Sequence, residues 1–355
     1  MLQGHGDDIY AYGREIRYNF SSNIFGRTDL SGLVAHLSER LECVRAYPEP
    51  EPLVLEAQIA ERFGLQPDEV CVTNGATEAI YLIAQLFRGM KSYVFQPTFS
   101  EYTDACRLHG HTVKSVYSTE AIDEEADIVW LCNPNNPTGE VRTVDKLNEL
   151  IQSHPSVCFV IDQSYEDFTD KPVFSAIHAA SMPQVILLHS ATKRFAIPGL
   201  RLGYITASAA LLQRIRMQRM PWSVNAMAIE AGLYFYNKFR ISDIGDLTRD
   251  TADDGGSAGS ITHLIQETER LRQAIENLKI AEVWPTDTHF FLMRLRFGKS
   301  AALKKYLIEE HGILIRDAAN FEGLDDTFVR IATQTREEND FLINALATWK
   351  TFFLY

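Results

Sequence analysis

Six short apolar runs between about residues 70 and 207 constrain the fold of this chain more than any other feature. The stretches between them have helical character, as at 77–87, where the apolar residues fall on one face. Several runs are apolar throughout rather than alternating, which is typical of strands covered on both faces in a mostly parallel sheet. The runs are 70–72, 92–95, 128–132, 157–161, 185–188 and 202–205. We therefore expect an α/β domain with helices on both sides of a sheet.

Polar residues follow four of these runs at the point where each predicted strand ends. They form the clusters 73–77, 133–139, Asp162 and 189–193. In open α/β sheets, ligands bind outside the carboxyl ends of the strands. The sequence therefore predicts that the four clusters converge on one site.

The remaining residues predict a second, smaller α+β domain. Helices are expected at 267–278 and 337–349, and strands at 289–295, 313–316 and 328–332. A polar, glycine-rich segment at 249–260 is typical of a surface loop. We expect a large domain over 26–240 and a small domain built from 1–25 and 241–355.

Composition excludes several classes of function. The chain has 355 residues and a net charge of −13, which argues against a surface for nucleic acid or anionic membrane. An anionic substrate would then need local arginines. The five cysteines lack CxxC spacing, and three lie in strand-like runs, which indicates free thiols in a reducing compartment. The first residues are too polar for a signal peptide and no apolar run has transmembrane length, so we expect a cytoplasmic protein without membrane partners.

Lys193 stands just past the fifth apolar run, with hydroxyls at Ser190 and Thr192 and a guanidinium at Arg201. A Ser/Thr-Lys pair alone is usually a solvated lysine after a turn. In this setting the amine suits a Schiff base with pyridoxal phosphate (PLP), with Ser190 and Arg201 holding the cofactor phosphate.

The other clusters supply matching groups. PLP chemistry needs an acid against the pyridine nitrogen, and Asp162 is placed for it. Tyr165 and Asn136 are candidates for the ring oxygen. Each is also an ordinary cap or turn residue when taken singly. The segment 75–77 presents backbone N–H groups and a hydroxyl to a phosphate, and it lacks the Gly-Lys-Ser/Thr ending of a nucleotide-binding P-loop.

Taken together and in order, these motifs resemble the class I/II aminotransferase superfamily of PLP-dependent enzymes, which has fold type I. The likeness covers nearly the whole chain. The resemblance implies that Lys193 is the Schiff-base lysine and proton shuttle, that Asp162 pairs with the ring nitrogen, and that Asn136 and Tyr165 bind the ring oxygen. The residues implied for the phosphate are Gly75, Ala76, Thr77, Ser190 and Arg201.

The resemblance extends to residues outside these clusters. It implies that Phe99 stacks on the cofactor ring, that Arg330 binds the substrate α-carboxylate, and that Tyr47 reaches the cofactor phosphate of a second subunit in a homodimer. The chain departs from the family at Gln163-Ser-Tyr165, where Glu-Ala-Tyr is usual. The histidines have no metal-ligand spacing, and we assign no metal.

Two subfamilies that act on phosphorylated substrates compete. Strings at 5–6, 19–24, 192–204, 220–226 and 313–320 look most like threonine-phosphate decarboxylase of cobalamin synthesis, and histidinol-phosphate aminotransferase shares the scaffold. Asn23-Ile-Phe-Gly26 departs from the Asn-Ile-Asn-Pro of the decarboxylase. Arg316, Asn23 and His5 are candidates for the substrate phosphate. A PLP-binding regulator without catalysis is a third, remote alternative, because the chain has no basic helix-turn-helix segment.

Overall fold

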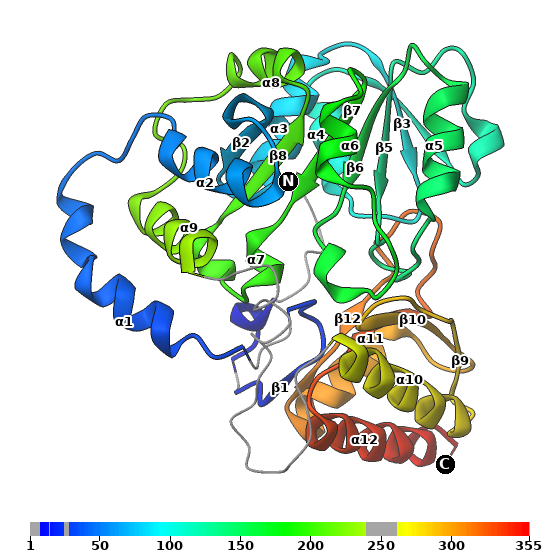
Figure 1. Cartoon of the computed structure of the whole chain (residues 1–355). Helices are drawn as coiled ribbons and strands as arrows, with labels where there is room; N and C mark the ends of the chain where they lie inside the picture. The colour runs from blue at the N-terminus through cyan, green and yellow to red at the C-terminus, as the bar shows by residue number, and fades with distance from the viewer. Residues whose placement is uncertain (1–7, 14, 25–27, 239–260, 355) are drawn as a thin grey trace.

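The computed structural model describes residues 8–13, 15–24, 28–238 and 261–354, and its largest feature is a seven-stranded sheet (Figure 1). In spatial order the strands are β2 (Val70–Thr73), β8 (Gly203–Ala207), β7 (Val185–His189), β6 (Cys158–Asp162), β5 (Ile128–Cys132), β3 (Lys91–Phe95) and β4 (Thr112–Val116). Neighbouring strands are parallel except around β8, which runs antiparallel to β2 and β7. The predicted α/β fold with a mostly parallel sheet is confirmed.

Each of the six apolar runs forms a strand, and all residues of β2, β5, β6, β7 and β8 are buried. The seventh strand, β4, was not predicted. It lies at the edge of the sheet, where Thr112 and Lys114 are exposed, so its sequence lacks the continuous apolar character of the others.

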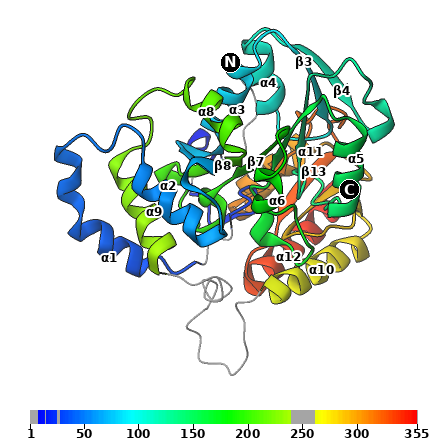
Figure 2. The same ribbon diagram turned by 45° about the horizontal axis from the view of Figure 1, so that its top comes forward.

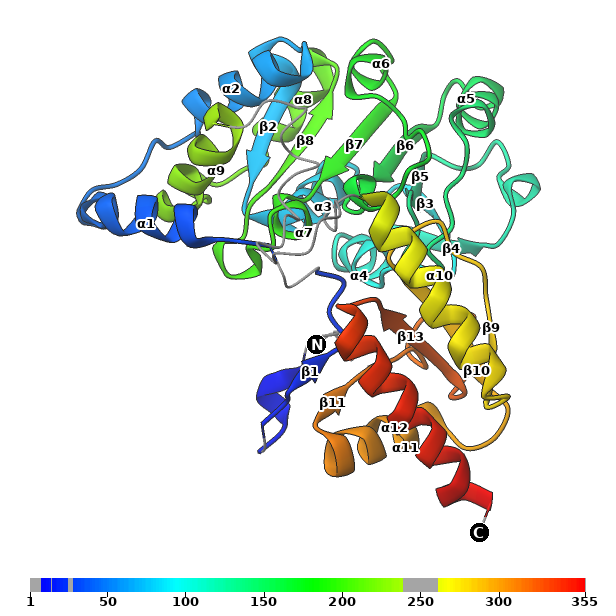
Figure 3. The same ribbon diagram turned by 60° about the horizontal axis from the view of Figure 1, so that its bottom comes forward.

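Helices cover both faces of the sheet, which explains the uniform apolarity of its strands. The first face packs against α3 (Gly75–Leu86), α4 (Glu101–Leu108) and α8 (Ala209–Arg216), and the second against α5 (Val144–Ser153) and α6 (Ala176–Ala180). In Figure 3, α5 and α6 lie above the sheet and α3 and α4 below it. The helix expected at 77–87 is confirmed as α3. A single helical turn, α7 (Ala191–Arg194), follows β7.

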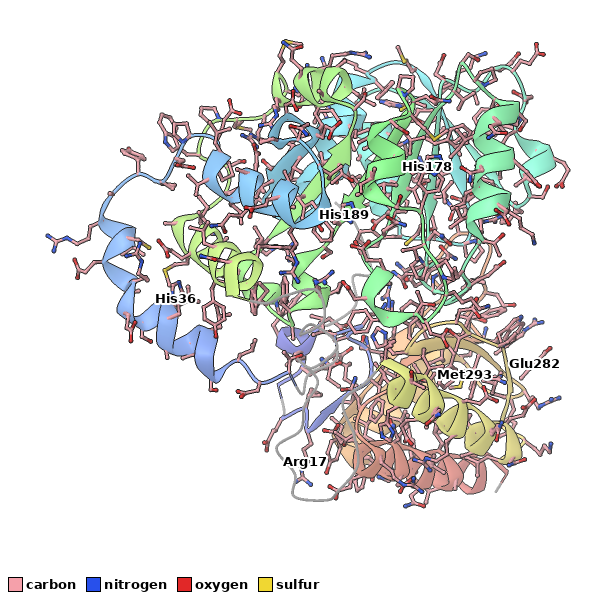
Figure 4. All side chains as sticks on the ribbon, viewed as in Figure 1. Arg17, His36, His178, His189, Glu282 and Met293 are labelled. Carbon is pink, nitrogen blue, oxygen red and sulfur yellow. The ribbon has the colours of Figure 1, made fainter. Side chains whose placement is uncertain are left out.

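Four further elements pack beside β2 and β8. They are α1 (Ser31–Glu39), the 3-10 turn η2 (Leu41–Arg45), α2 (Leu53–Phe63) and α9 (Ala226–Lys238). Helix α1 stands at the edge of the molecule (Figures 1 and 2). Arg40 donates to both carboxylate oxygens of Glu230, and His36, labelled in Figure 4, lies 3.4 Å from the same carboxylate. These contacts fasten α1 to α9.

The second sheet is antiparallel and belongs to the smaller part of the chain. Its order is β12 (Arg316–Asp317), β13 (Phe328–Ala332), β10 (Phe290–Leu295) and β9 (Ala281–Val283). Its core includes side chains of α10 (Ile261–Asn277), α11 (Ser300–Tyr306) and α12 (Arg336–Leu354), and α10 and α12 lie side by side in Figures 1 and 3. The helices expected near 267–278 and 337–349 and the strands at 289–295 and 328–332 are confirmed.

The prediction of one strand at 313–316 was wrong. The chain breaks at Ile315, so that β11 (Ile313–Leu314) pairs in parallel with β1 (Tyr18–Asn19), and β12 joins the four-stranded sheet. The apolar run at 313–316 therefore contributes to two sheets. Its apolar pattern does not show where the strand breaks. The remaining short turns are η1 (Ile9–Ala11), η3 (Pro67–Glu69), η4 (Thr119–Ala121), η5 (Glu166–Phe168), η6 (Pro198–Leu200) and the π turn η8 (Leu307–His311).

The two domains have distinct main cores, but Leu264, Phe290 and Ala332 pack with the core of the large sheet. Phe20 packs into the core formed by residues 271–349. The boundaries at 25/26 and 240/241 stay a prediction, because they and the segment 249–260 fall on or beside residues outside the described ranges. Within the described residues, no helix is both long and apolar enough to cross a membrane, and no three His, Cys, Asp or Glu side chains are grouped to hold a metal ion.

Candidate active site

The carboxyl ends of β2, β5, β6 and β7 border one cavity, and residues of the small domain line its other side. The convergence expected from the sequence is therefore seen in the structure. Of the predicted site residues, those that line the cavity are Asn23, Ala76, Thr77, Phe99, Asn136, Asp162, Tyr165, Ser190, Lys193, Arg201, Arg316 and Arg330.

Asp162, the last residue of β6, has a buried carboxylate that accepts two hydrogen bonds. Oδ1 accepts from the backbone N–H of Ser164 at 2.8 Å, and Oδ2 accepts from the phenol of Tyr102 at 2.7 Å. Tyr102 lies on α4, and its ring stacks on Trp130 with centroids 5.9 Å apart. Directed donors to an ionised group are the stronger class of hydrogen bond, so they hold the carboxylate in one orientation.

Lys193 lies on α7, and its neighbours tie this turn to the segment after Asp162. Arg194 forms an ion pair with Asp167 at 2.6 Å. His189, labelled in Figure 4, contacts Glu166 through Nδ1 at 2.8 Å and Thr206 through Nε2 at 2.9 Å. The lysine is thus carried by a short turn that two side-chain bridges fasten in place.

The first turn of α3 forms a cradle with Arg201. Gly75 begins the helix at φ 76°, and a Cβ there would lie 2.5 Å from Arg201 Nη2. Gly203 approaches the same turn so closely that its Cβ would lie 2.6 Å from the backbone nitrogen of Ala76. Only glycine fits both positions, so the backbone N–H groups of the helix start and the guanidinium share one small space. That arrangement suits a phosphate.

Two buried arginines from the small domain line the opposite wall. Arg330 donates through Nη1 to Asn136 Oδ1 and through Nη2 to the carbonyl of Ser21. Arg316 donates through Nη2 to Asn320 Oδ1 at 2.7 Å. Burial lowers the pKa of both guanidinium groups below the ordinary arginine value. An anionic ligand would offset this cost.

Charge distinguishes the cavity from the rest of the molecule. Its charged lining residues within the described part of the chain are Lys193, Arg201, Arg316, Arg330 and Asp162. Four are basic and one is acidic, whereas the whole chain carries −13. The local arginines that an anionic substrate would need are therefore present.

A short chain of hydrogen bonds links His289 to Asn23 and Tyr165, which line the cavity. The amide nitrogen of Asn23 donates to the phenol oxygen of Tyr165 at 3.0 Å, and Nε2 of His289 lies 3.2 Å from the Asn23 carbonyl. Burial, helped by the charges of Arg330 and Lys193, lowers the pKa of His289 to about 3. The imidazole is therefore neutral and donates through Nε2. Burial raises the pKa of Tyr165, which keeps its phenol protonated.

Three predicted residues are not among those that line the cavity. Gly75 lies directly beside it and makes room for Arg201. Tyr47 is 86% exposed and contacts Trp222, with ring centroids 5.4 Å apart. His5 lies outside the described residues.

Sequence reasoning missed several residues of the cavity wall, including Ser21, Ser100, Tyr102, Asn320 and Phe321. Tyr102 carried a usable signal, because it follows Phe99 by three residues on the predicted site segment. Asn320 carried another, since it follows Arg316 by four residues.

The residues present fit PLP. A cradle that a Cβ would fill can hold its phosphate, a carboxylate fixed by two donors can face its ring nitrogen, and a lysine lines the same cavity. Comparison with protein families agrees. The model of the class I and II aminotransferases matches residues 42–346.

The chain belongs to the class I and II aminotransferase family.

Enzymes of this family use pyridoxal 5'-phosphate, and this is the cofactor of the chain. The chain is 28% identical to a threonine-phosphate decarboxylase of Salmonella typhimurium, over 92% of this chain and 90% of that one. It is also 28% identical to a histidinol-phosphate aminotransferase of Thermoanaerobacter sp., over 85% and 84%. The crystal structure of L-threonine-O-3-phosphate decarboxylase from Porphyromonas gingivalis matches with a TM-score of 0.86 and 38% identity, covering 94% of this chain and 99% of that one. Both expected subfamilies thus occur among the similar enzymes.

Proposed function

We propose that this enzyme removes the carboxylate of a phosphorylated amino acid of the threonine-phosphate type. The observation that carries the proposal is a cavity in which Lys193 and Asp162 face two buried arginines, Arg316 and Arg330. Threonine phosphate carries two anionic groups, a carboxylate and a phosphate. Two separate cations match such a substrate, because each buried guanidinium can pair with one of its anionic groups.

The cofactor supplies an electron sink for charge that develops at the substrate Cα. Lys193 would hold and deliver the proton at that carbon, and Asp162 would pair with the ring nitrogen. Asn136 and Tyr165 would hold the ring oxygen, and Phe99 would cover the ring face. Ala76, Thr77, Ser190 and Arg201 would hold the phosphate.

Arg330 binds the α-carboxylate and Arg316 the distal phosphate, with Asn23 and His5 as further phosphate contacts. Arg330 is already oriented by Asn136 and the carbonyl of Ser21. Its Nε, buried and without a hydrogen-bond partner among the described residues, leaves capacity for a carboxylate oxygen. This spare donor supports a substrate site at Arg330.

Amino transfer on a phosphorylated substrate such as histidinol phosphate is the alternative. The two reactions differ in the bond at Cα that stands perpendicular to the cofactor plane, C–COO⁻ or C–H. Decarboxylation is favoured by the 38% identity and 0.86 TM-score of the Porphyromonas decarboxylase, against 26% and 0.81 for a histidinol-phosphate aminotransferase from Clostridium acetobutylicum.

We also propose a homodimer in which Tyr47 reaches the cofactor phosphate of the second subunit. Exposed apolar side chains are frequent on the N-terminal arm, residues 31–54, and on the segment 217–222. They are Val34, Leu41, Val44, Tyr47, Leu53, Val54, Met217, Met220 and Trp222. Large exposed apolar patches mark protein interfaces, which supports a second copy on this face. A cytoplasmic location is supported by the five free cysteines.

The function is tested by incubating the holoenzyme with threonine phosphate and, separately, with histidinol phosphate plus 2-oxoglutarate. Aminopropanol phosphate with CO₂ is the expected product of the first incubation. Glutamate from the second would make the enzyme an aminotransferase. Neither product, with cofactor still bound, would favour the non-catalytic regulator. Lys193→Ala is the control, and it should remove the product of whichever reaction is found.

A further inference from the structure

The proposed function gives Asp162 a role at the cofactor ring, and the group that contacts Asp162 most closely is the phenol of Tyr102. Its oxygen donates to Asp162 Oδ2 at 2.7 Å. Neither the sequence nor the family assignment gave this tyrosine a task. The hydrogen bond rests on two side chains from different elements, α4 and β6, that the fold brings together.

The phenol is fixed before any ligand binds. Tyr102 is 1% exposed, and its ring stacks on Trp130 at an interplanar angle of 19°. It meets the Phe99 ring edge to face, with ring centroids 5.8 Å apart. Trp130 is itself buried and donates to Ser92 Oγ at 3.4 Å. Packing on both sides therefore prevents the ring from leaving the carboxylate, and the hydrogen bond costs no ordering entropy during the reaction.

The direction of the hydrogen bond is also fixed. Burial, with a further contribution from the Asp162 charge, raises the pKa of Tyr102 well above its ordinary value. The phenol stays protonated and donates, and the carboxylate accepts. A donor to a buried carboxylate stabilises its ionised form.

We propose that Tyr102 is a positioning residue that holds the Asp162 carboxylate in the orientation in which it would pair with the ring nitrogen of the cofactor and keep that nitrogen protonated. This inference rests on the proposed function, and it deepens it by naming what holds the electron sink in its active form. Without the phenol the carboxylate loses a donor that orients it. Its pairing with the ring nitrogen would weaken, and the ring would lose positive charge.

The test is the ¹⁵N chemical shift of ring-labelled cofactor bound to the wild-type enzyme and to Tyr102→Phe. The wild type should show a protonated ring nitrogen, and Tyr102→Phe should shift toward the unprotonated value. The same variant should lower kcat about ten- to hundredfold, the range for a hydrogen bond to a charged group, with KM nearly unchanged.

Tyr93→Phe is the matched control. Tyr93 is 3% exposed and also donates to a carboxylate, that of the half-exposed Asp123, at 2.6 Å, but it packs in the core on the other face of the sheet. Its loss should change neither the ¹⁵N shift nor kcat. Equal effects of the two variants would assign Tyr102 a purely structural role and overturn the proposal.

A double-mutant cycle with Asp162→Asn tests that Tyr102 acts through Asp162. In the Asp162→Asn background no buried charge depends on the phenol, so adding Tyr102→Phe should have no further effect on the ¹⁵N shift or kcat. If Tyr102→Phe alone folds poorly, the comparison within the Asp162→Asn background still tests whether Tyr102 acts through Asp162. Additive losses would contradict the proposal. A wild-type enzyme that binds no PLP would instead remove the proposed function itself.

Discussion

At the scale of single residues, His289 makes the stability of the enzyme depend on pH. The buried imidazole has a pKa of about 3 in the folded chain against an ordinary 6.5. Between these values the unfolded chain binds a proton that the folded chain excludes. The free energy of unfolding therefore falls as pH drops through this window, by up to about 1.4 kcal/mol per pH unit.

Replacing His289 with Phe should flatten this slope. The variant keeps a ring against Phe168, which lies 4.1 Å from the imidazole between centroids, and loses the hydrogen bond to Asn23. It should be less stable near pH 7 by about 1 kcal/mol. Urea unfolding between pH 4 and 6 measures the slope. His263→Asn, at an exposed site on α10, is the control that should keep the wild-type slope. A wild-type slope in His289→Phe would contradict the assignment.

At the scale of elements, the start of α3 depends on a residue without a side chain. Gly75→Ala places a methyl group 2.5 Å from Arg201 Nη2 at φ 76°, so the guanidinium must move away from the cradle. We expect about tenfold weaker binding of PLP, measured by fluorescence titration of the apoenzyme, from an energetic loss of about 1.4 kcal/mol.

Gly89→Ala separates backbone strain from this displacement. Gly89 has nearly the same φ, 79°, and a Cβ there meets nothing within 4 Å. Both variants should lose about 1 kcal/mol of unfolding free energy from the left-handed backbone. Only Gly75→Ala should lose PLP affinity. Equal affinities in the two variants would show that Arg201 does not depend on this turn.

Secondary-structure elements were predictable where burial left a pattern. Strands such as β5 and β6 are buried on both faces, so only apolar residues fit and the runs were visible. The edge strand β4 was missed because Lys114 and Thr112 are exposed. The antiparallel direction of β8 and the break at Ile315 were also hidden, because an apolar run encodes neither strand direction nor the partner strand.

The residues of the site divide in the same way, into those with a local sequence signal and those that only tertiary packing brings to the site. Lys193, Asp162 and Arg201 were found because they end strands or stand at fixed spacing in the sequence. Tyr102 was missed as a site residue because its significance lies in one hydrogen bond to a strand 60 residues away. This contact depends on tertiary packing, and the local sequence shows only that Tyr102 follows Phe99 by three residues.

At the scale of the whole molecule, the N-terminal arm is expected to bury its apolar face against a second copy. Val44, on η2, is 59% exposed. Val44→Glu places a charge in the proposed interface, and burying an unpaired charge is costly. Sedimentation velocity should give a two-chain mass for the wild type and a shift toward one chain for the variant.

Ile177→Glu is the control for this experiment. Ile177 is 58% exposed but lies on α6, away from the arm. It should leave the mass unchanged. A one-chain wild type, or equal dissociation by both variants, would contradict the dimer and with it the placement of Tyr47 in the second site.

The attachment of the cofactor to Lys193 is tested most directly by reducing the holoenzyme with borohydride, digesting it and locating the modified lysine by mass spectrometry. Reduction should fix the pyridoxyl phosphate group on the peptide that contains Lys193, and no such peptide should appear from Lys193→Ala. A modified lysine elsewhere in the chain, or an unmodified Lys193 in protein that retains its cofactor, would contradict the account of the site.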